Sequence, residues 1–251
     1  MSSLSRIRAE FVASWHSFLR RRTAVFFTFF FPVIIVLIFG ALVQTQPTGG
    51  GLFAEPPAYY VPGYLAVVVL FTPLSRVGST IARHRDGNRF EKLATTPLRR
   101  DEWLLGQILV NVVVIGLAAL LLLVLTVVVT GVSLPLRPAT LSIVLFVALG
   151  VTLFCGLGAI LGRVADSQDG VIAASNAVAL PLLFLSETFV TPDLLPAWFR
   201  PAMDLSPLTY FARGVRAVTT GAGDPWTNLG ILAVLALVFF AAGAVAIPRT
   251  D

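Results

Sequence analysis

The chain has 251 residues, of which 57% are hydrophobic and only 12% are charged. A soluble domain carries about 25% charged residues, so this composition excludes an ordinary soluble protein. Apolar runs of about 20 residues recur, and they are continuous instead of alternating as in a β-barrel. We therefore predict an all-α polytopic membrane protein, in which the net charge of +5 reflects basic cytoplasmic loops and no nucleic-acid partner.

Residues 1–23 are predicted to form an amphipathic helix at the cytoplasmic membrane surface. Apolar residues recur along one face at spacings of three or four, namely Leu4, Ile7, Phe11, Trp15 and Phe18. The segment ends in an arginine cluster at residues 20–22, which we expect to meet the headgroups of anionic membrane lipids. Binding of a partner protein is the alternative. No small-residue cleavage site follows, so the first span is expected to remain as a signal anchor.

Six membrane spans are predicted, at about residues 24–43, 60–82, 103–130, 139–162, 170–190 and 227–247. With the N-terminus inside, the cytoplasmic segments hold 13 of the 18 Lys and Arg residues, the external segments hold four, and Arg76 lies in a span. This bias places both termini in the cytoplasm. The fourth span is expected to pack closely on its neighbours through small residues, namely Gly150, Gly156, Gly158 and Gly162.

The external region, residues 191–225, is predicted to contain broken helices because five prolines interrupt it. One helix should begin at Ser206 and Pro207, a favourable N-cap and first-turn pair. Its apolar face is predicted to lie on or dip into the outer leaflet and carries Leu208, Phe211, Val215 and Val218. Arg216 falls on another face, and Tyr210 is expected in an aromatic belt at the outer interface.

The cytoplasmic loop, residues 83–102, is predicted to contain a short helix with capping or helix-breaking residues at both ends. Asn88, with Glu91 three residues later, is predicted to cap a helix over residues 89–95. Residues before proline avoid the α region, so this helix must stop, and Thr96 with Pro97 is predicted to start the next one.

The short helix carries one apolar face, formed by Phe90, Leu93 and Ala94. Helices of this length are unstable alone in water, so the face must pack against something. Two candidates remain open: the membrane surface or the protein's own helices on the one hand, and a cytoplasmic partner protein on the other.

Two stretches carry a resemblance to a known family. RDGNRFEKLATTPLRRDEWLLGQIL resembles the cytoplasmic loop of ABC transporter type-2 permeases, whose pattern is close to E-x-G-T-x-E-x-L-x-x-T-P-L-x-R-x-E-x-L-x-G-K. PLLFLSETFVTPDLLPAWFRPAMDLSPLTYFARGVRAV is similar to the end of the family's fifth span and the helix after it. The sequence departs from the family pattern at Asn88, Gln107, Ser206 and Glu187, the last of which replaces a small residue.

The resemblance implies the permease subunit of an ATP-driven exporter. Its short cytoplasmic helix would be the coupling helix that docks on a separate ABC ATPase subunit, through Asn88, Arg89, Phe90, Glu91, Leu93, Ala94, Thr96 and Pro97. ATP and Mg would bind to that subunit, because this chain lacks a G-x-x-x-x-G-K-[ST] loop and no cofactor is expected on it. Two permeases, expected to be a homodimer, would work with two ATPases in a prokaryotic plasma membrane, on a drug, a lipid or a lipid-linked glycan.

Polar residues in or near the spans are the remaining candidates for a transport pathway, namely Arg76, Asn111, Asn176 and Glu187. Instead of lining a pathway, Arg76 could extend its side chain to the cytoplasmic surface. Glu187 could instead pair with external arginines. The two asparagines are predicted to form hydrogen bonds between helices. No catalytic or metal site is predicted. Two other functions stay open: an ion- or proton-coupled carrier without an ATPase, and an intramembrane enzyme, for which the sequence offers no Cys/His/Glu constellation.

Overall fold

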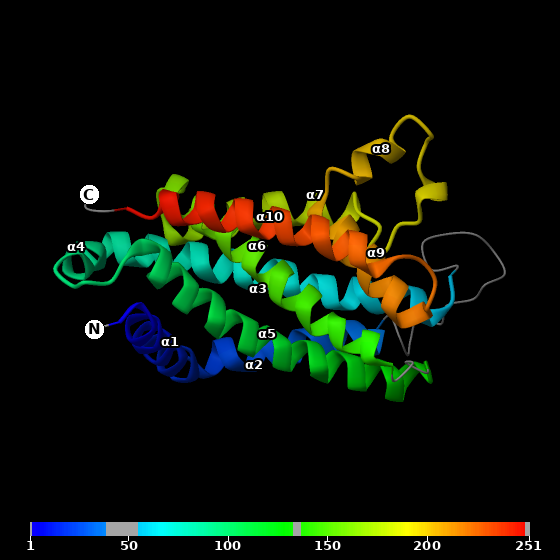
Figure 1. The fold of residues 1–251 in the computed structure, drawn as a ribbon, viewed down its shortest axis with the longest axis horizontal. Helices are drawn as coiled ribbons and strands as arrows, with labels where there is room; N and C mark the ends of the chain where they lie inside the picture. Colours follow the sequence, from blue (N-terminus) through cyan, green and yellow to red (C-terminus); the bar gives the residue numbers. More distant parts are fainter. Residues whose placement is uncertain (1, 39–54, 133–136, 249–251) are drawn as a thin grey trace.

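The computed structural model describes residues 2–38, 55–132 and 137–248, and this part of the chain is helical without β-strands. Its longer helices run side by side along the long axis of the molecule (Figure 1). Four are long and apolar enough to cross a membrane: α3 (Pro57–Asp86), α5 (Arg100–Thr130), α6 (Ser142–Val164, preceded by the 3₁₀ turn Pro138–Leu141) and α10 (Pro225–Ala246). Two further apolar helices are shorter, α2 (Arg22–Val36) and α7 (Gln168–Phe184).

Each of the six predicted spans overlaps one of these helices, and two of the predicted ends differ from the helix ends. The last part of the first span, residues 39–43, lies outside the described residues. The fifth span was predicted to reach residue 190, which is wrong, because α7 ends at Phe184. The hydroxyl groups of Ser186 and Thr188 both donate to the carbonyl oxygen of Leu183, at 2.8 and 2.7 Å, and turn the chain away from the helix.

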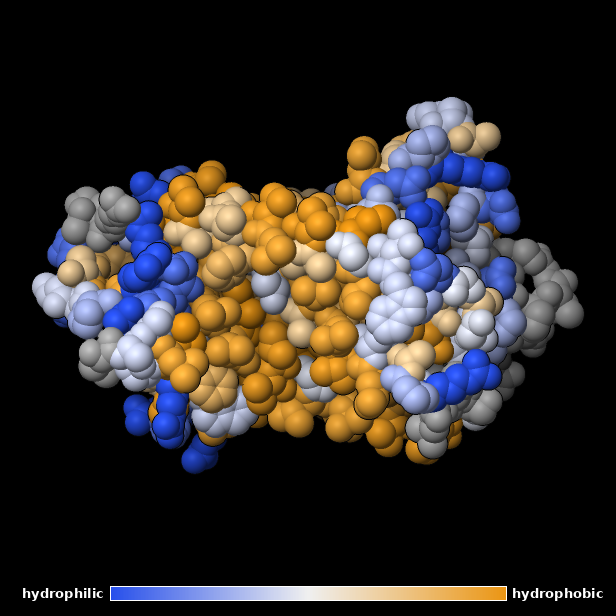
Figure 2. Space-filling model, in the orientation of Figure 1, coloured by the Kyte–Doolittle hydropathy of each residue, from blue (hydrophilic) through white to orange (hydrophobic). Residues whose placement is uncertain are grey.

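The charged elements gather at the two ends of the bundle. One end, here called the α4 end, holds α1 (Ser3–Leu19), α4 (Arg89–Ala94) and the end of α10 (Figure 1). The opposite end, the α9 end, holds the 3₁₀ turn Pro192–Leu194, α8 (Arg200–Met203) and α9 (Pro207–Thr220). Between them Figure 2 shows a broad hydrophobic band. Its exposed side chains include Phe26, Phe27, Leu117, Leu120, Val234 and Leu237, a surface that suits the hydrocarbon of a bilayer.

Helix α6 packs at backbone contact with a helix on either side. A Cβ atom added at Gly158 would lie 2.4 Å from the carbonyl oxygen of Leu74 in α3. One added at Gly156 would lie 2.2 Å from the carbonyl oxygen of Phe239 in α10. Real Cβ atoms do not approach so closely, so only glycine fits. The close packing predicted for the fourth span is confirmed.

The apolar face of helix α9 is covered by other parts of the protein, whereas the sequence predicted that lipid covers it. Its apolar face is buried within the protein, with Leu208, Phe211, Val215 and Val218 all at most 5% exposed. The face packs on α3, α6 and α10, so the prediction that it lies on the lipid is wrong. Pro207 starts α9 as expected, but the hydroxyl of Ser206 donates to the carbonyl oxygen of Leu182, at 3.2 Å, instead of capping the helix.

We predict that Gly156→Ala lowers the stability of the bundle because the new methyl group must push α10 away from α6. Overpacking of this kind costs about 1–3 kcal/mol. The measurement is the thermal unfolding midpoint of the purified protein in detergent. Gly116→Ala is the matched control, since no atom lies within 4 Å of a Cβ placed there. Equal midpoints for the two variants would contradict the close approach of α6 and α10.

Candidate functional site

Helix α4 begins where the backbone of Asn88 turns left-handed. The φ and ψ angles of Asn88 are 50° and 33°, a conformation that asparagine tolerates better than most residues. Its side chain makes no cap hydrogen bond, so the predicted capping box with Glu91 is wrong. Asn88 instead acts through its backbone, which redirects the chain between α3 and α4. The helix itself runs over Arg89–Ala94, close to the predicted 89–95.

Residues 95–99 form a turn between α4 and α5. The hydroxyl of Thr96 donates to the carbonyl oxygen of Leu93 (2.7 Å), and Pro97 is exposed in the turn. Helix α5 starts only at Arg100, so the prediction that Thr96 and Pro97 begin it is wrong. Its first turn is closed by Glu102, whose Oε2 accepts the backbone N–H of Arg99 at 3.0 Å.

Phe90 attaches α4 to both neighbouring helices. It is 6% exposed, and its ring meets the edges of His84 in α3 and Trp103 in α5, with centroid distances of 5.4 and 5.7 Å. Leu93 is partly buried against the same core, whereas Ala94 is exposed. Of the two candidates for covering this face, the protein's own helices therefore cover Phe90 and Leu93. A displacement of α4 would act directly on α3 and α5.

The opposite face of α4 is open at the end of the molecule. Arg89, Glu91 and Lys92 are exposed there. Beside it lies a cavity of about 700 Å³ between α4, the start of α5 and the end of α10, lined in part by Leu93, Leu98, Phe240, Ala244 and Ile247. The guanidinium of Arg100 donates to the carbonyl oxygen of Val245 (3.2 Å), which ties α5 to α10. Charged groups thus border an apolar hollow, an arrangement that can receive a protein partner.

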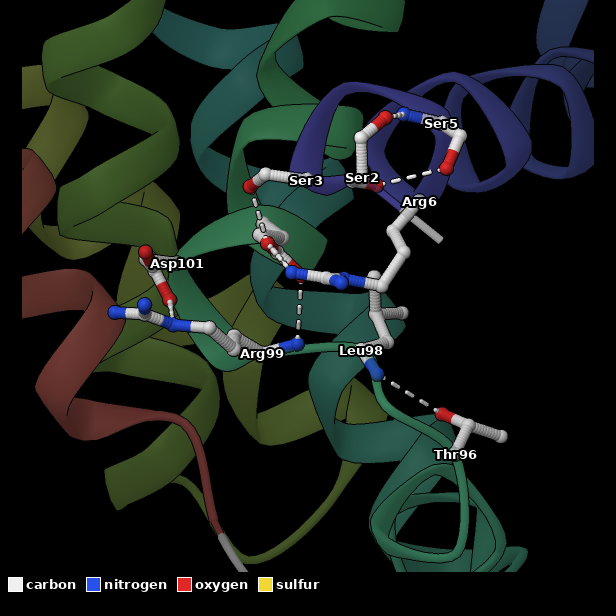
Figure 3. A network of polar contacts seen from close by, with 9 residues as sticks. Ser2, Ser3, Ser5, Arg6, Thr96, Leu98, Arg99 and Asp101 are labelled. Carbon is white, nitrogen blue, oxygen red and sulfur yellow. Dashed lines mark hydrogen bonds and ion pairs between the residues drawn. The ribbon is translucent and has the colours of Figure 1, made fainter.

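Helix α1 is fastened to the first turn of α5 by a buried ion pair. Arg6 donates Nε to Oε2 of Glu102 at 2.7 Å and Nη2 to Oε1 at 2.5 Å, and the hydroxyl of Ser3 also donates to Oε1. Figure 3 shows Ser3 and Arg6 reaching from α1 toward the turn at Arg99. Glu102 is 3% exposed, so one carboxylate both closes α5 and holds α1. Sequence reasoning missed this ion pair, because the only local signal is an acidic residue in the first turn of α5.

A second polar contact between α1 and α5 involves Gln107. Its Nε2 donates to Oε1 of Glu10 at 2.7 Å and to the hydroxyl of Ser14 at 2.6 Å. A Cβ atom at Gly106 would lie 2.6 Å from Cγ of Glu10, so glycine lets the helices meet here. Burial raises the pKa of Glu10. The signal in the sequence was Gln107 itself, which stands where the family usually has lysine.

At the α9 end, Glu187 pairs with two arginines of α9. Its Oε1 accepts from Arg213, and its backbone oxygen accepts from Nη2 of Arg216 at 2.5 Å. The guanidinium of Arg216 lies 3.7 Å above the ring of Tyr59, at the start of α3. Glu187 therefore pairs with arginines of α9, the alternative to a pathway role that the sequence left open for it. Tyr210 donates its hydroxyl to the carbonyl oxygen of Asp204 at 2.8 Å.

The other polar residues predicted in the spans do not converge on one place. Asn111 is buried but donates to the carbonyl oxygen of Gln107 (2.8 Å) in its own helix, so the predicted bond between helices is wrong. Asn176 is exposed on α7 and has no side-chain hydrogen bond to the described residues. Arg76 lies over the ring of Phe18, with Cζ 4.3 Å from the centroid.

Comparisons with known proteins show which sequences this chain is similar to. The profile of the family described as ABC-2 type transporter matches residues 6–219. The daunorubicin resistance ABC transporter permease protein DrrB1 of Streptomyces coeruleorubidus is 28% identical over 222 residues, which cover 82% of this chain and 74% of that protein. The inner membrane transport permease YadH of Escherichia coli is 25% identical over 188 residues, 72% of this chain and 71% of that protein.

A further relative, the probable multidrug ABC transporter permease YbhS of Escherichia coli, is 24% identical over 188 residues. The match covers 74% of this chain and 48% of that longer protein. Since the family profile spans most of the sequence, the chain belongs to the ABC-2 type transporter family. It is a multi-pass membrane subunit of an ABC transporter, a class that transports without catalysing a reaction by itself and associates with an ABC ATPase.

We predict that Glu102→Gln loosens α1, because the neutral amide cannot replace the charged hydrogen bonds from Arg6. Amide hydrogen exchange along α1 should become at least roughly tenfold faster. Asp101→Asn is the matched control, since Asp101 also loses its charge in the first turn of α5 but pairs only with the exposed Arg99. Exchange in α1 that is equally fast in both variants would contradict the assigned role of Glu102.

The raised pKa of Glu10 predicts a pH-dependent stability difference from Glu10→Gln. A carboxyl whose pKa is raised by folding stabilises the protein while it is protonated, and this contribution is lost as pH rises through the folded pKa. The unfolding midpoint of the wild type should therefore fall relative to that of Glu10→Gln as the pH rises above 4.5, the ordinary pKa of this carboxyl group. Parallel pH profiles of the two proteins in thermal unfolding would rule this out.

Proposed function

We propose that this chain is the permease subunit of an ATP-driven exporter, with α4 as the coupling helix that receives a separate ABC ATPase. The observation that carries the proposal is the construction of α4. Its exposed face presents Arg89, Glu91 and Lys92, while Phe90 on the other face is held by α3 and α5. A protein bound to the exposed face would move both helices together.

The proposed topology has six spans, with α2 and α7 crossing the membrane as well as the four longer helices. The α4 end, which carries most of the Lys and Arg residues, would then face the cytoplasm, as the positive-inside rule requires. Both termini would lie there too, in the plasma membrane of a prokaryote. The working complex would hold two copies of this chain as a homodimer and two ATPase subunits that bind ATP and Mg.

The proposed cargo is a lipophilic or amphiphilic molecule: a drug, a lipid or a lipid-linked glycan. The names of the relatives support the first of these, since one concerns daunorubicin resistance and another multidrug transport. ATP-driven closure of the two ATPases would push on α4 and favour one of two arrangements of the bundle, which opens toward the α9 end.

Two substitutions on the two faces of α4 should separate binding from coupling. Glu91→Arg reverses an exposed charge, and like charges at an interface disfavour association, so recovery of the ATPase with the tagged permease should fall at least roughly tenfold. Phe90→Ala keeps the exposed face but frees α4 from α3 and α5. It should therefore retain the ATPase and its ATP hydrolysis while export into inverted vesicles is lost.

Asp166→Arg is the matched control, because it makes the same charge reversal in an exposed loop at the same end of the protein. It should bind the ATPase and export like the wild type. If mild extraction of the wild type recovers no ATPase carrying a phosphate-binding loop, or if Glu91→Arg exports normally, the proposed function is wrong.

A further inference from the structure

Arg76 stands apart from the other arginines that lie within the bundle. Arg6 is paired with Glu102, Arg216 with Glu187, and Arg85 donates to the carbonyl oxygens of residues 162, 163 and 165 at the end of α6. Nη1 of Arg76, in contrast, is buried without a hydrogen-bond partner among the described residues. An unpaired guanidinium at this depth is costly, so a counter-charge from outside the chain is expected.

The surroundings of Arg76 add positive charge, and among the described residues no carboxylate pairs with it. Thr80 and Arg83 follow on the same face of α3, where Nη2 of Arg83 donates to the hydroxyl of Thr80 at 3.0 Å. Arg21, at the corner between α1 and α2, is close enough to interact electrostatically with both Arg76 and Arg83. None of these three arginines forms an ion pair with an acidic residue in the described part of the chain.

The position of this arginine cluster suits a lipid headgroup. Arg21 and Arg22 are exposed at the corner that joins α1 to the apolar helix α2. Arg76 lies seven residues before Arg83, or about 10 Å deeper along α3 at 1.5 Å per residue. Arg76 as a residue retains partial exposure, and its guanidinium lies over the ring of Phe18 near the end of α1.

We propose that Arg76, together with Arg21 and Arg83, binds the phosphate group of an anionic phospholipid at the junction of α1, α2 and α3. A guanidinium donates two parallel hydrogen bonds to phosphate oxygens, and arginines near a membrane surface attract anionic lipids. The bound lipid would contact α1, α2 and α3 together and hold the two N-terminal helices against α3. This site is independent of the ATPase and of α4.

The test compares lipids of one acyl composition by thermal unfolding of the full-length protein in detergent. Phosphatidylglycerol should raise the midpoint of the wild type more than phosphatidylcholine. Arg76→Gln should show about fivefold weaker apparent affinity for phosphatidylglycerol, whereas Arg76→Lys keeps part of it. Arg163→Gln is the matched control, an exposed arginine at the same end of the protein but outside the proposed site, and it should respond like the wild type. Equal responses of Arg76→Gln and the wild type would overturn the proposal.

Inorganic phosphate, compared with chloride at equal ionic strength, distinguishes the two sources of a phosphate group. Stabilisation by the lipid alone assigns the site to membrane lipid, and stabilisation by both probes assigns it to phosphate from either source. If Arg76→Gln fails to fold, native mass spectrometry of the wild type still decides the matter. The site would be refuted if the wild type retained no more phosphatidylglycerol than phosphatidylcholine and inorganic phosphate did not raise its unfolding midpoint.

Discussion

The structure depends on the backbone contact of α6 with α3 on one side and α10 on the other. Helices surrounded by lipid gain little from the hydrophobic effect on meeting each other, so close packing of small residues must hold them together. Gly158 admits the carbonyl oxygen of Leu74, and Gly156 admits that of Phe239. These contacts join three helices into one unit. The elements at both ends are arranged around that unit.

Helix α3 connects the two ends of this unit. It has 30 residues, or about 45 Å at 1.5 Å per residue. At one end His84 contacts Phe90 of α4, and at the other Tyr59 lies under the guanidinium of Arg216. Because α6 holds α3 along its middle, a displacement at α4 would reach the α9 end as a movement of packed helices. In the proposed exporter, this continuity would couple the two ends.

Part-buried ion pairs join the peripheral helices to their neighbours. Glu102 holds α1 through Arg6, and Glu187 holds the segment after α7 against α9 through Arg213 and Arg216. The Glu102 carboxylate receives several donors, and the Glu187 carboxylate accepts from Arg213 and lies 3.9 Å from Nη1 of Arg216, which offsets their removal from water. Arg76 lacks such a partner, and the proposed phosphate site would supply the missing charge.

The sequence by itself determined the helical membrane class, most of the helix boundaries and the glycine packing of α6, because these follow from apolar length and residue size along the chain. It also located α4, since Asn88 tolerates the left-handed conformation before the helix and residues before Pro97 avoid the α region. The tertiary structure decided which partners the side chains find. Asn88, Thr96 and Ser206 looked like helix caps, yet none caps the predicted helix. Arg6 and Glu102 are 96 residues apart. No local pattern records that contact, because it exists only once α1 has packed on α5.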